Sequence, residues 1–516
     1  MARPPLGLRL LAAMVAAALL VPLGYLLLRA FAADPATLSG IVFRWRNLEL
    51  MGNTAALTGL VLAFSTLIAL PLAWLTTRSD LPHKKLFTVL AVLPLAVPGY
   101  VMAYALIGLA GYSGLANALF GLRLPRPEGL LGAATALTLY IFPYLFLNLR
   151  AALLSMDAGL EETARSLGCA PLATFRRVTL PHLLPALASG WLITALYVIG
   201  DFGVVALMRF EVFSYAIFTQ YSAAFDRTSA AWLSLMLLAV TLVLLLGASR
   251  LSARRRLARV GTGLGRRAGD VPLGRLRPLA YAFLALVHGV SLGLPLLTLG
   301  YWMSFVAFDA TAGQLASVFL HTLSAAAPAA AVACALAVPL VVLLVRYPSP
   351  GTAMLERFVY LGYAVPPLAF GLALVFFALG AVPWVYQSLT LLVAAYALHF
   401  LALAIGPLRS ALMQMGVRPE QAARALGYGR LETFAKVTLP RLRKSVIAGA
   451  LMVFIVVVKE LPITFLLAPP GFTTLATRVF SYTSEGMLYE AAPYAALLVA
   501  FSSLFVGLVV RYEGGR

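Results

Sequence analysis

The sequence predicts an all-α polytopic membrane protein with about twelve transmembrane helices, arranged as two tandem parallel repeats of six helices. The first observation behind this prediction is composition: 62% of the 516 residues are hydrophobic, only 11% are charged, and the mean hydropathy is +0.92. A soluble protein usually carries about 25% charged and about 45–50% apolar residues. The composition therefore excludes a water-soluble globular enzyme, a disordered protein and a collagen-like fibre. The second observation is that the two halves of the chain repeat each other.

Twelve stretches of the chain have the length and composition of a membrane-spanning helix, which needs about 20 mostly apolar residues. They are 9–30, 54–76, 86–111, 130–149, 186–208, 230–248, 278–306, 321–345, 357–380, 385–406, 445–468 and 493–510. Ala30-Phe31-Ala32 resembles a signal-peptide cleavage site. The apolar run before it is longer than the about 7–15 residues of such a signal, so we expect a retained first helix.

The distribution of charge predicts the orientation of these spans. The chain has 39 Lys and Arg residues against 19 Asp and Glu residues, a net charge of +20. If both termini are cytoplasmic, the cytoplasmic segments hold 30 basic and 9 acidic residues, and the outside loops hold 8 of each. Basic residues retained in cytoplasmic loops are the usual signature of membrane orientation. We therefore expect a multi-pass protein of the cell (inner) membrane with both termini in the cytoplasm.

The most basic segment, 249–277, separates two halves of six predicted spans, 1–248 and 278–516. It carries nine arginines and one aspartate. A polybasic loop between two membrane helices is expected to lie on the anionic lipid leaflet of the bilayer rather than to bind nucleic acid. The two cysteines and five histidines are scattered, so the sequence predicts no disulfide and no metal site.

The two halves repeat each other in sequence. Residues 161–183 and 420–442, related by an offset of 259, are identical at thirteen of 23 positions. Four further pairs match at an offset of 268: Thr54/Thr322, Pro71/Pro339, Arg78/Arg346 and Pro98/Pro366. Both halves start on the same side, so they are parallel repeats, and transporters with such repeats place their pathway at the interface.

The repeated segment is polar and lies between the fourth and fifth spans of each half. A helical run ends at Gly168 or Gly427, where a C′ glycine in the left-handed conformation is expected. A short amphipathic run follows and reaches a proline at the start of the next span. One interpretation is a helix lying flat on the membrane. The matched polar residues favour a second interpretation, duplicate docking sites for a two-fold-symmetric partner.

These segments resemble the cytoplasmic signature of the permeases of binding-protein-dependent ABC importers: E-A-A, three residues, G, nine residues, I, one residue, L-P. The copies here are Glu162-Thr163-Ala164, Gly168, Val178, Leu180-Pro181 and Gln421-Ala422-Ala423, Gly427, Val437, Leu439-Pro440. In that family the segment forms a cytoplasmic coupling helix that fits a groove on the ATPase subunit. The resemblance implies ATPase coupling by Glu161, Glu162, Ala164, Gly168, Leu180, Pro181, Glu420, Gln421, Ala423, Gly427, Leu439 and Pro440. Gln421 departs from the usual Glu, so a charged contact there is expected only in the first half.

The chain contains no G-x-x-x-x-G-K-[ST] phosphate loop, so it supplies no ATPase of its own. The resemblance therefore implies a transport subunit that is not an enzyme and binds no cofactor. Its partners would be two copies of an ABC ATPase subunit, which use ATP and Mg²⁺, and a periplasmic or surface solute-binding protein.

A finer resemblance is to the fused permeases of ferric-iron importers. It rests on Gly200-Asp201-Phe202-Gly203 and Lys459-Glu460-Leu461-Pro462, in the fifth and eleventh spans. Fused permeases for thiamine, phosphonates and related solutes share parts of these patterns, so such solutes remain an alternative. Two rivals are an ion-coupled secondary transporter that uses Asp201 or Glu460, and a membrane-embedded enzyme, for which the sequence offers no clustered catalytic constellation.

Asp201 and Glu460 are related by the same offset of 259 and are predicted to be helix-interior positions, each followed by a potential break, at Gly203 and Pro462. An ionisable group at the centre of a membrane helix costs about 2.5–3.5 kcal/mol on insertion scales. One interpretation places both carboxylates and Lys459 along the translocation pathway or at its gate. The other is structural, with Lys459 and nearby hydroxyl or backbone groups neutralising them.

Tight metal coordination within the spans is not predicted. Hard cations favour several oxygen ligands, and the spans offer these carboxylates plus scattered tyrosines such as Tyr100 and Tyr363. Prolines at 94 and 98, and at 366 and 367, are expected to kink the third and ninth spans.

Overall fold

The computed structural model describes residues 4–32, 34–254 and 270–514, and all its named elements are helices. Most of the predicted linker, residues 255–269, lies outside the described residues. The first half comprises α1 (Leu6–Ala30), α2 (Pro35–Val42), α3 (Trp45–Arg78), α4 (Lys84–Val92), α5 (Gly99–Leu109), α6 (Leu115–Phe120), α7 (Gly129–Ser155), α8 (Ala158–Ser166), α9 (Pro171–Thr174), α10 (Leu180–Gly200), α11 (Gly203–Leu207), α12 (Phe213–Ser222) and α13 (Arg227–Arg254).

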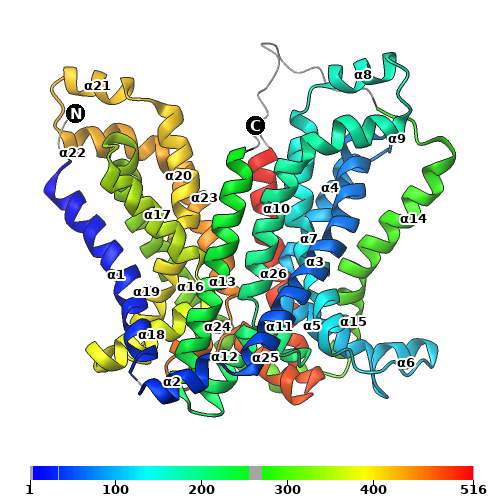
Figure 1. The fold of residues 1–516 in the computed structure, drawn as a ribbon, viewed down its shortest axis with the longest axis horizontal. Coiled ribbons are helices and arrows are strands. Elements are labelled where there is room, and N and C mark those ends of the chain that lie inside the picture. Colours follow the sequence, from blue (N-terminus) through cyan, green and yellow to red (C-terminus); the bar gives the residue numbers. More distant parts are fainter. Residues whose placement is uncertain (1–3, 33, 255–269, 515–516) are drawn as a thin grey trace.

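The second half repeats this series. It comprises α14 (Arg277–His288), α15 (Leu294–Met303), α16 (Phe308–Arg346), α17 (Pro350–Ala364), α18 (Pro367–Ala381), α19 (Leu389–His399), α20 (Leu401–Met415), α21 (Arg418–Ala425), α22 (Arg430–Thr433), α23 (Leu439–Val458), α24 (Pro462–Leu467), α25 (Leu475–Glu485) and α26 (Leu488–Gly514). The described chain begins and ends at the same end of the helix bundle, the top in Figure 1.

Within the described residues, eight helical stretches are long and apolar enough to cross a membrane, and three bent helix pairs raise the number to as many as eleven. The helix α23, which belongs to the predicted eleventh span, is not among them. Its first two turns carry Arg441, Arg443 and Lys444. The described residues thus support eight to eleven of the twelve predicted spans.

The predicted third and ninth spans are sharply bent. The helices on the two sides of Pro98 meet at 92°, and those on the two sides of Pro366 meet at 105°. The residues before these prolines, Val97 and Val365, have extended backbone, as expected because proline disfavours helical geometry in the residue before it. The predicted kinks are confirmed, but neither segment is one straight helix.

The first span of each half packs against the other half. This span is α1 in the first half and the continuous stretch of α14 and α15 in the second. Tyr25 on α1 contacts Phe377 on α18 with the ring centroids 5.4 Å apart. In the opposite direction, the indole of Trp302 on α15 donates a hydrogen bond to the carbonyl of Gly108 on α5, at 3.1 Å. The halves are therefore interlocked by their first helices, which the sequence repeat did not reveal.

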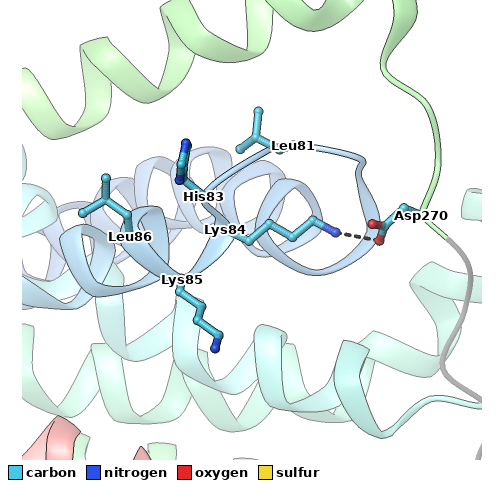
Figure 2. A pocket seen from close by; sticks show the side chains of 6 residues that line it. All are labelled: Leu81, His83, Lys84, Lys85, Leu86 and Asp270. Carbon is cyan, nitrogen blue, oxygen red and sulfur yellow. Dashed lines mark hydrogen bonds and ion pairs between the residues drawn. The ribbon is translucent and has the colours of Figure 1, made fainter.

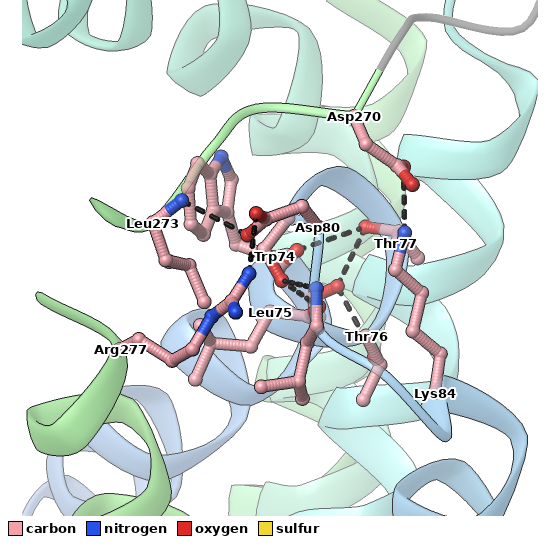
Figure 3. A network of polar contacts seen from close by, with 12 residues as sticks. Trp74, Leu75, Thr76, Thr77, Asp80, Lys84, Asp270, Leu273 and Arg277 are labelled. Atoms are coloured by element: carbon pink, nitrogen blue, oxygen red, sulfur yellow. Dashed lines mark hydrogen bonds and ion pairs between the residues drawn. The ribbon is translucent and has the colours of Figure 1, made fainter.

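The end of the linker is fastened to the loop between α3 and α4. Asp80 accepts hydrogen bonds from the backbone N–H of Leu273 (2.9 Å) and from the guanidinium of Arg277 (2.7 Å), as Figure 3 shows. Lys84 reaches Asp270 at 2.6 Å, and Lys85 points away from it (Figure 2). The hydrogen bond from the Leu273 N–H, together with the smaller effect of the positive charge of Arg277, holds the pKa of Asp80 below its usual value. These contacts fix where the second half begins.

Candidate functional site

The two repeated segments adopt the same structure. Each consists of a short helix, a glycine turn and a four-residue helix (α8 and α9, α21 and α22), followed by a π-helical turn that leads into α10 or α23. Gly168 and Gly427 have φ of +84° and +89°, which confirms the predicted left-handed glycines. Both segments lie at the end of the bundle where the described chain begins and ends (Figure 1). Two equivalent surfaces thus face the same side.

The exposed side chains of these segments are candidates for contact with a partner. Glu162 and Gln421 are exposed, whereas Ala164 and Ala423 are 8% and 5% exposed and face the body of the protein. Among the other predicted positions, Leu180 and Pro181 are partly exposed, and Leu439 and Pro440 are exposed.

Two leucines missed by the sequence analysis lie directly before the glycine turns. Leu167 and Leu426 are 79% and 80% exposed, which is high for large apolar side chains. The sequence carried one signal for them, namely that both are leucines at the offset of 259 that relates the two repeated segments. A matched pair of exposed apolar side chains at one end of the molecule suits a two-fold protein contact.

Glu161 and Glu420 are turned inward, away from the exposed face. Glu161 is 7% exposed and accepts a hydrogen bond from the hydroxyl of Thr179 at 2.7 Å. Glu420 accepts the equivalent bond from Thr438 at 3.1 Å and pairs with Arg346 at 3.0 Å. These two carboxylates hold the segments against the body of the protein.

The predicted breaks near Gly203 and Pro462 are present, but Asp201 and Glu460 lie within them, so the prediction that these carboxylates are helix-interior is wrong. Asp201 follows the end of α10, and its Oδ1 accepts the N–H of Val204 in α11 at 2.8 Å. Glu460 follows the end of α23 and accepts the N–H groups of Ile463 (2.9 Å) and Thr464 (3.1 Å) in α24. A carboxylate at a helix N-terminus satisfies free N–H groups and favours the helix dipole. Both therefore cap short helices at equivalent places.

Lys459 contacts the opposite half. Its ammonium donates a hydrogen bond to the carbonyl of Leu95 at 2.9 Å, and its own carbonyl accepts the hydroxyl of Tyr100 at 3.3 Å. Within the part of the chain that the structure describes, Lys459 forms no ion pair with Asp201 or Glu460. The expected neutralisation of the carboxylates comes from backbone N–H and hydroxyl groups, and Lys459 links the halves.

Four tyrosines gather near Asp201, although the sequence analysis treated such residues as scattered. The hydroxyl of Tyr140 donates to Asp201 Oδ2 at 3.1 Å. The ring of Tyr144 stacks on that of Tyr197 with centroids 4.6 Å apart, and the hydroxyls of Tyr197 and Tyr363 are 3.5 Å apart. In the described residues, no group of three or more His, Cys, Asp or Glu side chains could hold a metal ion. Four tyrosine hydroxyls and one carboxylate thus lie in one series between α7, α10 and α17.

Four phenylalanines fill the interface on the other side of the helix breaks. Phe202 and Phe218 come from the first half, and Phe465 and Phe480 come from the second. The centroids of Phe202 and Phe480 are 5.3 Å apart, and those of Phe218 and Phe465 are 5.9 Å apart. Their helices lie toward the end of the bundle opposite the repeated segments (Figure 1). The aromatic cluster therefore packs the two halves together toward that end.

Interlocked halves of apolar helices, a carboxylate at the equivalent helix break of each half and two equivalent exposed segments at one end are typical of a duplicated membrane transport protein. The chain belongs to the family described as the binding-protein-dependent transport system inner membrane component, whose model matches residues 65–259 and 335–512. Two separate matches confirm the internal repeat. The chain is accordingly a multi-pass protein of the inner membrane and a transport subunit.

The chain is also similar to individual transport permeases. The chain is 31% identical over 515 residues to the Fe(3+)-transport system permease protein FbpB 2 of Haemophilus influenzae, covering 99% of both chains. It is 30% identical over 200 residues to the sulfate transport system permease protein CysT of Salmonella typhimurium, covering 37% of this chain and 71% of the relative. The predicted resemblance to importer permeases, and to fused ferric-iron permeases in particular, is confirmed.

A solved structure of the MetNI methionine ABC transporter in inward facing conformations is also similar. The match covers 41% of this chain and 96% of that one, at 19% identity and a TM-score of 0.34. This level of similarity supports no conclusion about the fold.

Proposed function

We propose that this chain is the permease of an ATP-driven importer that receives ferric iron from an outside binding protein and delivers it to the cytoplasm. The observation that carries the proposal is the identity of 31% over the full length, both halves included, to a protein named as an Fe(3+) transport permease. Relatives such as the sulfate permease match little more than one third of this chain.

In this proposal the end with the repeated segments is cytoplasmic, both termini lie there, and α23 completes twelve spans. Three basic residues in the first two turns of α23 suit the cytoplasmic membrane surface. The excess of basic residues in the loops at that end, 30 against 8 outside, supports the same orientation.

Each repeated segment would dock one ATPase subunit, and those subunits would use ATP and Mg²⁺ while this chain binds no cofactor. The exposed Glu162, Leu167, Gln421 and Leu426 would contact the ATPases. The solute-binding protein would dock at the opposite end, beside the aromatic cluster.

The route for coupling follows from chain continuity. The π-helical turns Phe175–Thr179 and Phe434–Thr438 pass without interruption into α10 and α23. Those helices end at the breaks capped by Asp201 and Glu460. When ATP draws the ATPases together, movement of the segments would be transmitted along α10 and α23 to the aromatic cluster and open it outward. Hydrolysis would reset the halves.

Co-purification tests the assignment. An ATP-binding protein is expected to purify with the tagged wild-type chain and to be lost when Gly168→Asp and Gly427→Asp are combined. The control is Gly121→Asp, because Gly121 also has a positive φ (+66°) with open space around its Cβ, but lies between α6 and α7, away from the segments. Failure of any ATPase to co-purify, with transport intact in the double variant, would point to a secondary transporter.

A further inference from the structure

We propose that Asp201, Tyr140, Tyr144, Tyr197 and Tyr363 form an oxygen track that holds a hard trivalent cation in transit between the halves. The inference rests on the proposed function and specifies the chemistry by which this chain would carry ferric iron. The name oxygen track is used below for these five side chains.

The track crosses the interface between the halves. Tyr140 and Tyr144 lie one helical turn apart on α7, and Tyr197 lies on α10. Tyr363, on α17 of the second half, brings its hydroxyl to 3.5 Å from that of Tyr197. Asp201 lies at the other end of the series, 3.1 Å from the Tyr140 hydroxyl. A cation held here would therefore contact both halves.

The exposure of these tyrosines distinguishes them from tyrosines that only pack. Tyr104, Tyr396 and Tyr494 are buried, with 0–1% exposure, as core side chains are. The four tyrosines of the track are only partly buried, and so is Asp201. These side chains therefore keep some surface at the interface that the protein does not cover.

The donor atoms select the class of solute. Hard cations prefer oxygen ligands, and a phenol becomes a strong anionic ligand when its proton passes to water. The carboxylate of Asp201 would repel an oxyanion such as sulfate and attract a cation. Asp201, Lys459 and Glu460 together give the spans a net charge of −1. The track therefore suits ferric iron better than an anion.

The arrangement also suits release. A conducting site must bind strongly enough to admit the ion and weakly enough to let it leave, which several partial sites achieve better than one closed cage. The ligands come from separate helices, and Tyr363 belongs to the opposite half. When the halves move apart, the contact between Tyr197 and Tyr363 would open and the ion would lose ligands.

The test uses the intact complex of the chain with its ATPase subunits. The absorption spectrum is recorded with ferric citrate, and uptake is measured in vesicles with the iron-loaded binding protein outside and ATP inside. Phenolate bound to iron(III) gives a visible charge-transfer absorption band, which a structural tyrosine would not. Loss of even an outer partner of a metal ligand costs about 10–100-fold in affinity or activity. The triple variant Tyr144→Phe, Tyr197→Phe, Tyr363→Phe, which keeps the phenol of Tyr140, is therefore expected to weaken the band and to lose at least about tenfold of the iron uptake.

The matched control is Tyr25→Phe, because this ring packs on Phe377 away from the track. It is expected to keep both the band and the uptake. Absence of the band in the wild-type complex, or an unchanged band and uptake in the triple variant, would overturn the track. The proposed function fails on a separate result, namely absence of ATP-driven iron uptake by the wild-type complex.

Discussion

Arg346 at the end of α16 and Glu420 in α21 form a bidentate ion pair, with Nε–Oε2 and Nη2–Oε1 distances of 3.0 and 3.1 Å. Their side chains are only 11% and 14% exposed. The equivalent arginine of the first half, Arg78, is buried, and its Nε and Nη2 have no hydrogen-bond partner among the described residues. The two equivalent arginines are thus bonded differently.

This asymmetry predicts unequal effects of two equivalent substitutions. Removing one partner of a buried ion pair costs up to about 3–5 kcal/mol because the other charge is left unpaired. Arg346→Ala should therefore reduce the iron taken up per ATP hydrolysed more than Arg78→Ala does. The measurement is coupled uptake and ATPase activity in proteoliposomes. An equal or larger defect in Arg78→Ala would contradict the asymmetric arrangement.

The two carboxylates at the helix breaks should respond differently to neutralisation. Asn caps a helix about as well as Asp, so Asp201→Asn keeps the cap of α11 and removes the charge required by the oxygen track. We expect reduced iron uptake at matched expression. Glu460 is 7% exposed, and its carboxylate accepts hydrogen bonds from two N–H groups of α24. The iron uptake of Glu460→Gln should therefore remain near that of the wild type. Wild-type uptake in both variants would remove any direct role for the carboxylates.

The aromatic cluster should act as the barrier on the outer side. Replacing a packed phenylalanine by alanine removes about 3–5 kcal/mol of packing and leaves a cavity. The double variant Phe218→Ala, Phe480→Ala is expected to admit solute into proteoliposomes without ATP. The readout is ATP-independent entry of a labelled solute. A tight vesicle with unchanged ATP-driven uptake would show that the closure lies elsewhere.

The contact between the linker and Asp80 predicts a pH dependence of stability. Because the Leu273 N–H and Arg277 hold the pKa of Asp80 below its ordinary value of 3.8, the carboxylate stabilises the folded state at higher pH. That contribution is lost as the pH falls through the lowered pKa. Thermal melting of the wild type in detergent should therefore drop at acid pH more steeply than that of Asp80→Asn. Parallel melting curves would exclude this contribution.

The features that the sequence predicted are local ones. The left-handed turns at Gly168 and Gly427 and the bends at Pro98 and Pro366 follow from residues adjacent in the chain. The features it missed depend on distant packing. The approach of Tyr197 to Tyr363 joins residues 166 positions apart, and nothing in the local pattern indicates it.

The helix breaks near Asp201 and Glu460 were predicted, but the position of the carboxylates within them was not. The apolar runs continue through both breaks, so hydropathy alone reads each span as one helix. The only local signals were Gly203 and Pro462, which begin the short helices that follow. The carboxylates cap those helices, a role that becomes visible only when the backbone is seen to break.

The central claim, that ATP drives import through this chain, is tested most directly by uptake of labelled iron into proteoliposomes. The vesicles contain the chain with its ATPase subunits, the binding protein is added outside, and ATP is enclosed inside. The account predicts uptake that requires hydrolysable ATP, persists when proton and sodium gradients are collapsed, and is abolished by Gly168→Asp with Gly427→Asp. Uptake that proceeds without ATP and stops when the ion gradients are collapsed would contradict it.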